Sequence, residues 1–161
     1  MDIYSFDSDS FISAWRIYYS ITSFPGVWEC FDQLITNRRV RCAEQIVGEI
    51  ERGGDELWEW VAQRRKKLSY PTDDAVQKAE RQILRTHPNL VEPNGKSAGD
   101  PWVIALAIVM GASVVTFEVP ITDPRSTKVK IPNVCRAYNI PCINVFEVIR
   151  REGWRFHRVV P

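Results

Sequence analysis

The stretch Ile3–Ile12, I-Y-S-F-D-S-D-S-F-I, decides the fold that the sequence predicts. Ile3, Tyr4 and Phe6 favour a β-strand, and this apolar run ends abruptly at Asp7. Open parallel α/β sheets place their functional groups beyond the carboxyl ends of the strands. We therefore expect a central strand that carries Asp7 at its tip.

Length and charge limit the classes of protein to consider. With 161 residues the chain is expected to form a single domain over 1–161, and its formal net charge of +1 argues against nucleic-acid binding through a general positive field. The longest uncharged run, Pro101–Phe117, is shorter than the about 20 apolar residues of a membrane-spanning helix, and no signal segment precedes the first strand. We expect a soluble, cytoplasmic protein that does not enter the membrane.

The four cysteines contain no C-x-x-C pair and lie in apolar-patterned segments. This pattern favours buried free thiols over disulfides or a zinc site. The cysteines are Cys30, Cys42, Cys135 and Cys142.

Apolar periodicity and turn residues predict that helices alternate with short strands along the chain. Helices are expected at 8–19, 25–37, 43–52, 55–68, 73–85, 100–110, 132–138 and 145–152, and further strands at 38–42, 113–117, 141–144 and 154–160. Ser8 or Asp9 is suited to cap the first helix, and Asp55 to cap the fourth. The alternation predicts an α/β domain.

A second acidic strand end follows a strongly apolar helix. Asp100 and Pro101 favour a helix start, with Asp100 as N-cap, and the strand at 113–117 ends at Glu118. If this strand is parallel to the first, Asp7 and Glu118 project from one edge of the sheet. The role of helix cap is by itself sufficient to explain Asp100.

Glu49 is the fourth acidic candidate. It follows Gly48 on the inner side of a predicted helix, where a glycine allows a ligand or another backbone to approach, although an ordinary surface glutamate fits the pattern equally well. Acids crowded at one edge need a positive partner, and an all-oxygen set suits Mg²⁺ or Mn²⁺. The sequence therefore predicts a divalent metal site built from carboxylates.

Basic residues beside these acids suggest a local site for phosphate groups. Four of them lie in loops expected near the strand ends: Lys96, Arg125, Lys128 and Lys130. A separate basic run at 64–67 lies at the C-terminal end of the predicted fourth helix, where the helix dipole stabilises positive charges. Contact with an RNA backbone is the alternative for that run.

The order of these motifs resembles the PIN domain, a family of metal-dependent ribonucleases that includes VapC-type toxins. Asp7-Ser8-Asp9 is similar to its D-x-N motif, and Thr116-Phe117-Glu118 to its T-x-D motif; Glu49 in V-G-E-I and Asp100 in A-G-D-P-W-V-I-A-L-A match its helical acids. The segments F-P-G-V-W, V-V-T-F-E, K-V-K-I-P-N-V-C and C-I-N-V-F-E resemble a PIN-like subfamily, DUF4411. Asp9 stands where the PIN family usually has Asn, and Glu118 where it usually has Asp.

The resemblance implies a three-layer α/β/α fold with a central, mostly parallel sheet of four to five strands. It also implies an endoribonuclease in which Asp7, Glu49, Asp100 and Glu118 hold Mg²⁺ or Mn²⁺, supported by Asp9 and Thr116. Such a protein is expected to be the toxin of a type II toxin–antitoxin pair, with RNA as substrate, a cognate antitoxin as partner and a homodimer as its assembly. An antitoxin surface on Trp28, Trp58 and Trp60 is one expectation, and a core position for these tryptophans is the other.

Two other functions also fit the sequence. A PIN-like module that binds RNA or protein without cutting would also account for the changes at Asp9 and Glu118. A receiver-like phosphotransfer domain would use Asp7 as its nucleophile, but Glu118 stands where such a domain is expected to have a lysine. Both alternatives predict an α/β fold.

Overall fold

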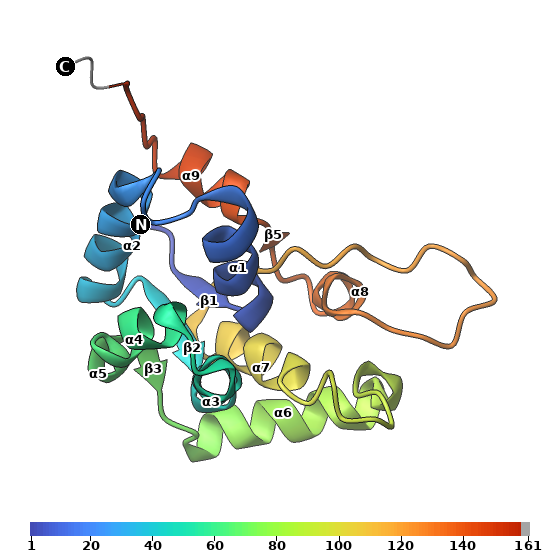
Figure 1. Ribbon diagram of the computed structural model, residues 1–161. Helices are drawn as coiled ribbons and strands as arrows, with labels where there is room; N and C mark the ends of the chain where they lie inside the picture. The colour runs from blue at the N-terminus through green and yellow to red at the C-terminus, as the bar shows by residue number, and fades with distance from the viewer. Residues whose placement is uncertain (159–161) are drawn as a thin grey trace.

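A parallel five-stranded sheet forms the centre of the computed structural model, which describes residues 1–158 (Figure 1). Its strands lie in the order β3-β2-β1-β4-β5, and every neighbouring pair is parallel. Tyr4 is in register with Val40 on one side and with Ser113 on the other. The strands are β1 (Tyr4–Phe6), β2 (Val40–Ala43), β3 (Ser69–Tyr70), β4 (Ser113–Val115) and β5 (Cys142–Ile143).

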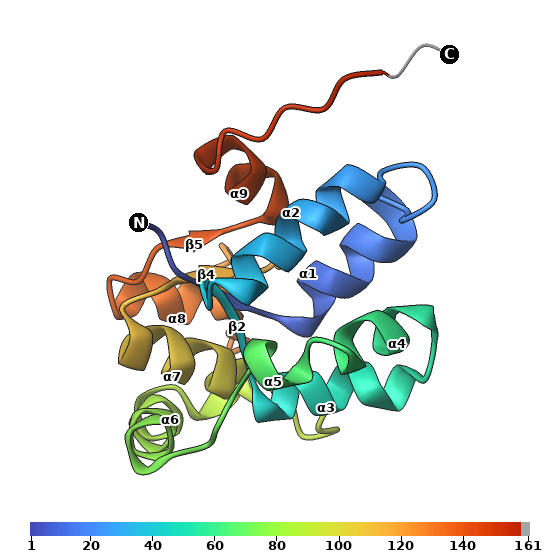
Figure 2. The ribbon, with the colours of Figure 1, turned by 90° about the vertical axis from the view of Figure 1, so that its left-hand side faces the viewer.

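Helices cover both faces of the sheet, which gives the three-layer α/β/α fold that the resemblance implied. Helices α1, α2 and α9 lie on one side, and α7 and α8 on the other, with α6 packed outside α7 (Figure 2). The helices are α1 (Ser8–Ser13), α2 (Pro25–Thr36), α3 (Glu44–Gly53), α4 (Glu56–Ala62), α5 (Arg65–Leu68), α6 (Asp74–Thr86), α7 (Asp100–Met110), α8 (Ile131–Ala137) and α9 (Val145–Arg151). A π-helical turn, η1 (Ala14–Tyr18), continues α1, and a 3₁₀ turn, η2 (Pro88–Leu90), follows α6.

The strand order reverses between β1 and β4. From β1 the chain moves outward to β2 and β3, and it then returns to the other side of β1 to form β4 and β5. Ligands of open α/β sheets bind in the crevice at such a switch point, outside the carboxyl ends of the strands. This order also differs from the 2-1-3-4-5 order of receiver-like folds, so the receiver-like alternative is wrong about the fold.

The core on the α2 side is aromatic. Phe6 and Phe11 have ring centroids 4.9 Å apart, and Trp28 and Trp60 lie 5.1 Å apart within the same cluster. Trp28 and Trp60 are buried and Trp58 is half-buried, so the expectation of a tryptophan surface for an antitoxin is wrong for the first two. Their packing joins α2 and α4 to the sheet.

The predicted helix at 55–68 is interrupted. It divides into α4 and α5 near Arg64, whose guanidinium donates to the carbonyl of Trp60 at 2.8 Å and pairs with Asp32 at 2.6 Å. Arg65 pairs with Glu51 at 3.7 Å, so half of the basic run has acidic partners within the protein. The short edge strand β3, which the sequence did not predict, follows directly.

The predicted strand at 154–160 is absent from residues 154–158, and its last two residues lie outside the described part. Trp154 instead closes α9, since its backbone N–H donates to Ile149 and its ring packs against Phe31 with centroids 5.1 Å apart. All four cysteines are free. In the part of the chain that the structure describes, no helix is both long and apolar enough to cross a membrane.

At the amino ends of the strands, Glu152 ties the last helix to the first strand. Its carboxylate accepts two hydrogen bonds from the Arg39 guanidinium, at 2.7 and 2.6 Å, and one from the Tyr4 hydroxyl at 2.6 Å. Both members of the ion pair are largely shielded from solvent. This arrangement fixes α9 to β1 at the sheet edge opposite Asp7.

Candidate carboxylate site

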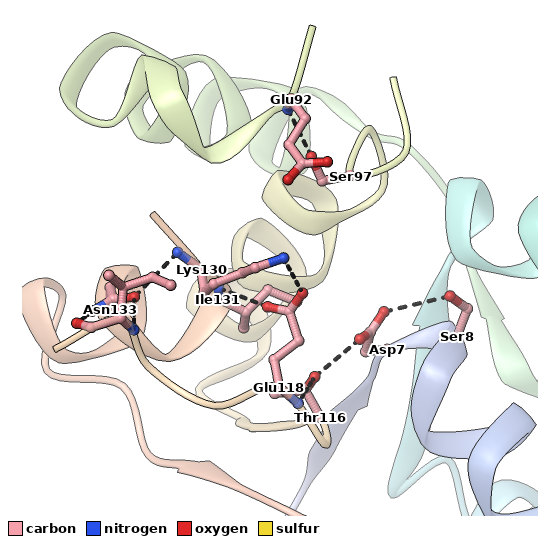
Figure 3. Close-up of polar contacts among 10 residues, drawn as sticks. Asp7, Ser8, Glu92, Ser97, Thr116, Glu118, Lys130, Ile131 and Asn133 are labelled. Atoms are coloured by element: carbon pink, nitrogen blue, oxygen red, sulfur yellow. Dashed lines mark hydrogen bonds and ion pairs between the residues drawn. The ribbon is translucent and has the colours of Figure 1, made fainter. Parts of the chain in front are cut away.

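Asp7 and Thr116 meet at the switch point of the sheet (Figure 3). The N–H of Asp7 donates to the carbonyl of Val115 at 3.0 Å, which extends the β1–β4 pairing one step past the strand. The Thr116 hydroxyl donates to Asp7 Oδ2 at 3.0 Å, and its oxygen accepts the N–H of Glu118 at 3.1 Å. The threonine thus holds two predicted site residues in fixed relation.

Glu49 reaches the same edge from α3. The Ser8 hydroxyl donates to Glu49 Oε2 at 2.6 Å and lies 3.5 Å from Asp7 Oδ1, so Ser8 stands between the two acids. The glycine that allows this approach is Gly99 rather than Gly48: a Cβ at Gly99 would clash with the Glu49 carboxylate, whereas a Cβ at Gly48 would have only Arg52 as a neighbour, at 3.8 Å. The expectation that another backbone approaches closely at Gly48 is therefore wrong.

Asp100 lies in the first turn of α7 and does not cap it. Gly99 holds the N-cap position, without a side-chain hydrogen bond, so the prediction of Asp100 as N-cap is wrong. The Asp100 side chain is buried, with the residue 8% exposed, and its Oδ2 atom has no hydrogen-bond partner. A buried carboxylate oxygen without a partner is costly unless a ligand or cation satisfies it.

Burial and neighbouring acids raise the pKa of both buried aspartates. Burial raises the pKa of Asp100 to about 8, with further increases from Glu118, Asp7 and Glu49 and a decrease from Lys130. Burial also raises the pKa of Asp7 to about 7; the hydrogen bond from Thr116 opposes this, whereas Glu118, Glu49 and Asp9 add to it. Asp7 and Asp100 therefore each lie near enough to the other predicted acids to be repelled by them, as expected if these acids converge at one edge.

Glu118 is held by partners from the loop before α8. Its carboxylate pairs with Lys130 Nζ at 3.4 Å and accepts the N–H of Ile131 at 3.0 Å (Figure 3). Glu118 in turn raises the pKa of Lys130, with smaller increases from Glu92 and Asp100. Lys130, predicted as an RNA contact, is thus the cation among the acids.

The remaining predicted residues lie outside this network. Asp9 accepts a hydrogen bond from the Ser13 hydroxyl at 2.7 Å, which gives it a partner within its own helix. Lys96 and Lys128 are exposed, and the exposed Arg125 pairs with Asp123 at 3.2 Å. Of the four predicted basic residues, only Lys130 forms an ion pair with one of the four acids within residues 1–158.

The donor set fits Mg²⁺ or Mn²⁺ by its chemistry, because it consists of carboxylate oxygens and leaves one of them without a partner. As the side chains are placed, no three Asp, Glu, His or Cys residues within 1–158 are grouped tightly enough to hold a metal ion together. Hydrogen bonds through Thr116 and Ser8 link Asp7, Glu118 and Glu49. Asp100 lies outside these hydrogen bonds, but the other three acids raise its pKa. We refer to Asp7, Glu49, Asp100 and Glu118 as the carboxylate site.

Sequence reasoning missed three contributors to the carboxylate site. Ser8, predicted only as a helix cap, donates to Glu49. Gly99, with no predicted role, leaves room for the Glu49 carboxylate. The N–H of Ile131, at the start of α8, donates to Glu118. A glycine directly before a buried acid at a helix start was the available signal for Gly99. No sequence signal pointed to Ile131.

A search of curated proteins found no match to the chain. A family model described as "Domain of unknown function (DUF4411)" matches residues 4–156, which include all four acids of the carboxylate site. The match covers nearly the whole chain. The protein therefore belongs to the DUF4411 family.

Proposed function

We propose that this protein is a PIN-type endoribonuclease that hydrolyses RNA phosphodiester bonds with Mg²⁺ or Mn²⁺. The observation that supports this most is Asp100, whose buried Oδ2 has no partner and whose pKa is raised to about 8 by burial and by the other three acids. Such repulsion has a structural cost, and a bound cation would remove it. The position at the switch point of the sheet is where an α/β fold binds its ligand.

In this proposal Asp7, Glu49, Asp100 and Glu118 hold the ion. A bound divalent ion would neutralise phosphate charge and lower the pKa of a water molecule to make a nucleophile at neutral pH. Thr116 fixes the orientation of Asp7 through its 3.0 Å hydrogen bond.

Three further residues support these ligands. Ser8 orients Glu49, and Lys130 offsets the charge of Glu118 next to the position proposed for the scissile phosphate. Asp9 acts from outside the cluster by raising the pKa of Asp7.

The partners follow from the resemblance to PIN toxins. We propose RNA as substrate, with Lys96, Arg125, Lys128 and Lys130 as phosphate contacts. We also propose a cognate antitoxin that silences the enzyme in the cytoplasm, and a homodimer as its assembly. The exposed positions of Lys96 and Lys128 leave both free to meet a nucleic-acid backbone.

The test is cleavage of structured and unstructured RNAs by the purified protein in Mg²⁺, Mn²⁺ or EDTA. Wild type should cut only with the metal, and Asp100→Asn should not cut. The matched control is Asp74→Asn, because Asp74 is an exposed acid in the first turn of α6, outside the proposed site, and should be dispensable. Intact RNA with every metal, from a protein shown to be folded, would refute the nuclease proposal.

One observation favours a second function, an RNA- or protein-binding module with weak catalysis. Glu118 already has two partners, Lys130 and the N–H of Ile131, so it is less available to an ion than the other three acids. The same assay separates the two functions when RNA binding is measured beside cleavage. Metal-independent binding without cutting would support the module.

A further inference from the structure

An aromatic cluster lies at the surface beside the carboxylate site. It comprises Tyr18 from η1, Phe117 after β4 and Phe146 from α9, with ring centroids 5.0 Å apart for Tyr18 and Phe117, 5.0 Å for Tyr18 and Phe146, and 5.4 Å for Phe117 and Phe146. Tyr18 is 41% exposed and Phe146 38% exposed, so two of the three rings meet solvent. We refer to these three residues as the aromatic platform.

Phe117 joins the platform to the carboxylate site. It lies between Thr116, which bonds to Asp7, and Glu118. It also lines a cavity of about 510 Å³ that Glu118 and Arg136 share. A phosphodiester bound at the carboxylates would therefore have its neighbouring nucleosides against Phe117 and this cavity.

The chemistry of this surface matches a nucleotide. The volume of the cavity falls in the range of small-molecule sites, and its wall combines an aromatic ring with a cation. Arg136 is exposed and forms no ion pair with the residues in 1–158, so its guanidinium is available for a phosphate. An apolar protein segment would make no use of an arginine and a carboxylate cluster at the same place.

We propose that the aromatic platform and this cavity form a nucleobase subsite, in which a base of single-stranded RNA stacks on the platform and Arg136 contacts an adjoining phosphate. The inference rests on the proposed function, because it places the scissile phosphodiester at the carboxylate site. Aromatic stacking accepts any base, since every base has a flat face. Duplex RNA keeps those faces inside its helix, so the subsite selects unpaired RNA.

The experiment measures binding and stacking separately from cleavage. Short RNAs that carry the fluorescent base 2-aminopurine at successive positions are titrated with Asp100→Asn protein in Mg²⁺, single-stranded and as blunt duplexes. The double change Tyr18→Leu and Phe146→Leu is made in that background, because leucine keeps apolar volume while it removes the rings. Circular dichroism and the thermal midpoint establish that each variant is folded.

Phe156 provides a matched control. It is 44% exposed, similar to Phe146, but its ring lies next to Gly26, where an added Cβ would be 3.5 Å from it. Phe156→Leu should leave RNA binding unchanged. The double change should weaken single-strand binding by about 5- to 100-fold and remove 2-aminopurine quenching. Arg136→Gln should lower the salt dependence of RNA binding by an amount that corresponds to about one phosphate contact.

Each result decides the inference independently of the nuclease proposal. Quenching at one or two adjacent positions that disappears in the double variant supports the subsite, even if wild type proves unable to cut RNA. Equal binding by parent and double variant, with wild type still cutting, overturns the subsite and leaves the nuclease intact. The subsite is also overturned if the protein binds no RNA, or if the rings prove necessary only for self-association in sedimentation.

Discussion

The raised pKa of Asp100 makes a stability prediction that needs no knowledge of the substrate. The pKa of Asp100 is higher in the folded state than in the unfolded chain. Between about pH 4 and pH 8, the folded protein therefore keeps this proton whereas the unfolded chain has lost it. The folded state therefore loses stability as the pH rises through this window. Burial of Asp100 is the main cause of this loss of stability, and the charges of Glu118, Asp7 and Glu49 add to it. The charge of Lys130 opposes it.

The size of the effect follows from the rise of the pKa from 3.8 to about 8. At about 1.4 kcal/mol for each pH unit, this corresponds to roughly 5–6 kcal/mol as an upper limit. Water entry and movement of the other carboxylates reduce it, so we expect Asp100→Asn to be more stable than wild type by about 1–3 kcal/mol at pH 8.5 without metal. For a chain of this length, that raises the thermal midpoint by roughly 3–10 °C.

The assay is urea unfolding in EDTA from pH 5 to pH 8.5 for wild type, Asp100→Asn and the exposed-acid control Asp123→Asn. The free energy of unfolding of wild type and of the control should fall with pH, and that of Asp100→Asn should fall less. Adding Mg²⁺ at pH 8.5 should stabilise wild type and leave Asp100→Asn unchanged, because binding to the folded state adds to its stability. If the free energy of unfolding depends on pH identically in wild type and Asp100→Asn, the proposed effect of the neighbouring acids on Asp100 is refuted.

Three further predictions test the frame around the carboxylate site. Gly99→Ala should reduce RNA cleavage about tenfold or more, because the added Cβ displaces the Glu49 carboxylate. Gly48→Ala should keep activity and stabilise α3 by about 0.5–1 kcal/mol. Equal activity of the two variants would contradict this prediction. Thr116→Val should lower cleavage about tenfold, and Thr116→Ser should restore it, because only serine keeps the hydrogen bond to Asp7. Initial rates at saturating metal measure both effects. Glu152→Gln should cost about 1–3 kcal/mol in urea unfolding with cleavage intact, and a loss of activity in the folded variant would contradict its purely structural role.

The sequence predicted the elements of the fold well where the local signal was strong. β1, β4 and α7 are short or strongly apolar segments bounded by Asp, Gly or Pro, and their types and positions are confirmed. The break between α4 and α5 was not predicted. It lies at Arg64, which pairs with Asp32 of α2, a residue distant in the sequence. The edge strand β3 has only two residues and shows no alternation, so its pairing with β2 decides its structure.

The carboxylate site could be predicted as a set of residues but not as a geometry. The parallel register of β1 and β4 brings Asp7 and Glu118 to one edge, as the strand ends suggested. The position of Ser8 between Asp7 and Glu49 depends on how α1 packs against α3, and the pairing of Lys130 with Glu118 depends on the loop before α8. No periodicity in the sequence encodes either arrangement. Sequence reasoning therefore found the acids and missed what orients them.

The place of β1 in the sheet has a consequence for how the chain matures. β1 lies at the centre of the sheet, and its partner β4 begins more than a hundred residues later, at Ser113. Contacts so distant in sequence form late and slowly. During translation Asp7 therefore emerges well before Asp100 and Glu118, and the carboxylate site assembles only after the segment through β4 has been made.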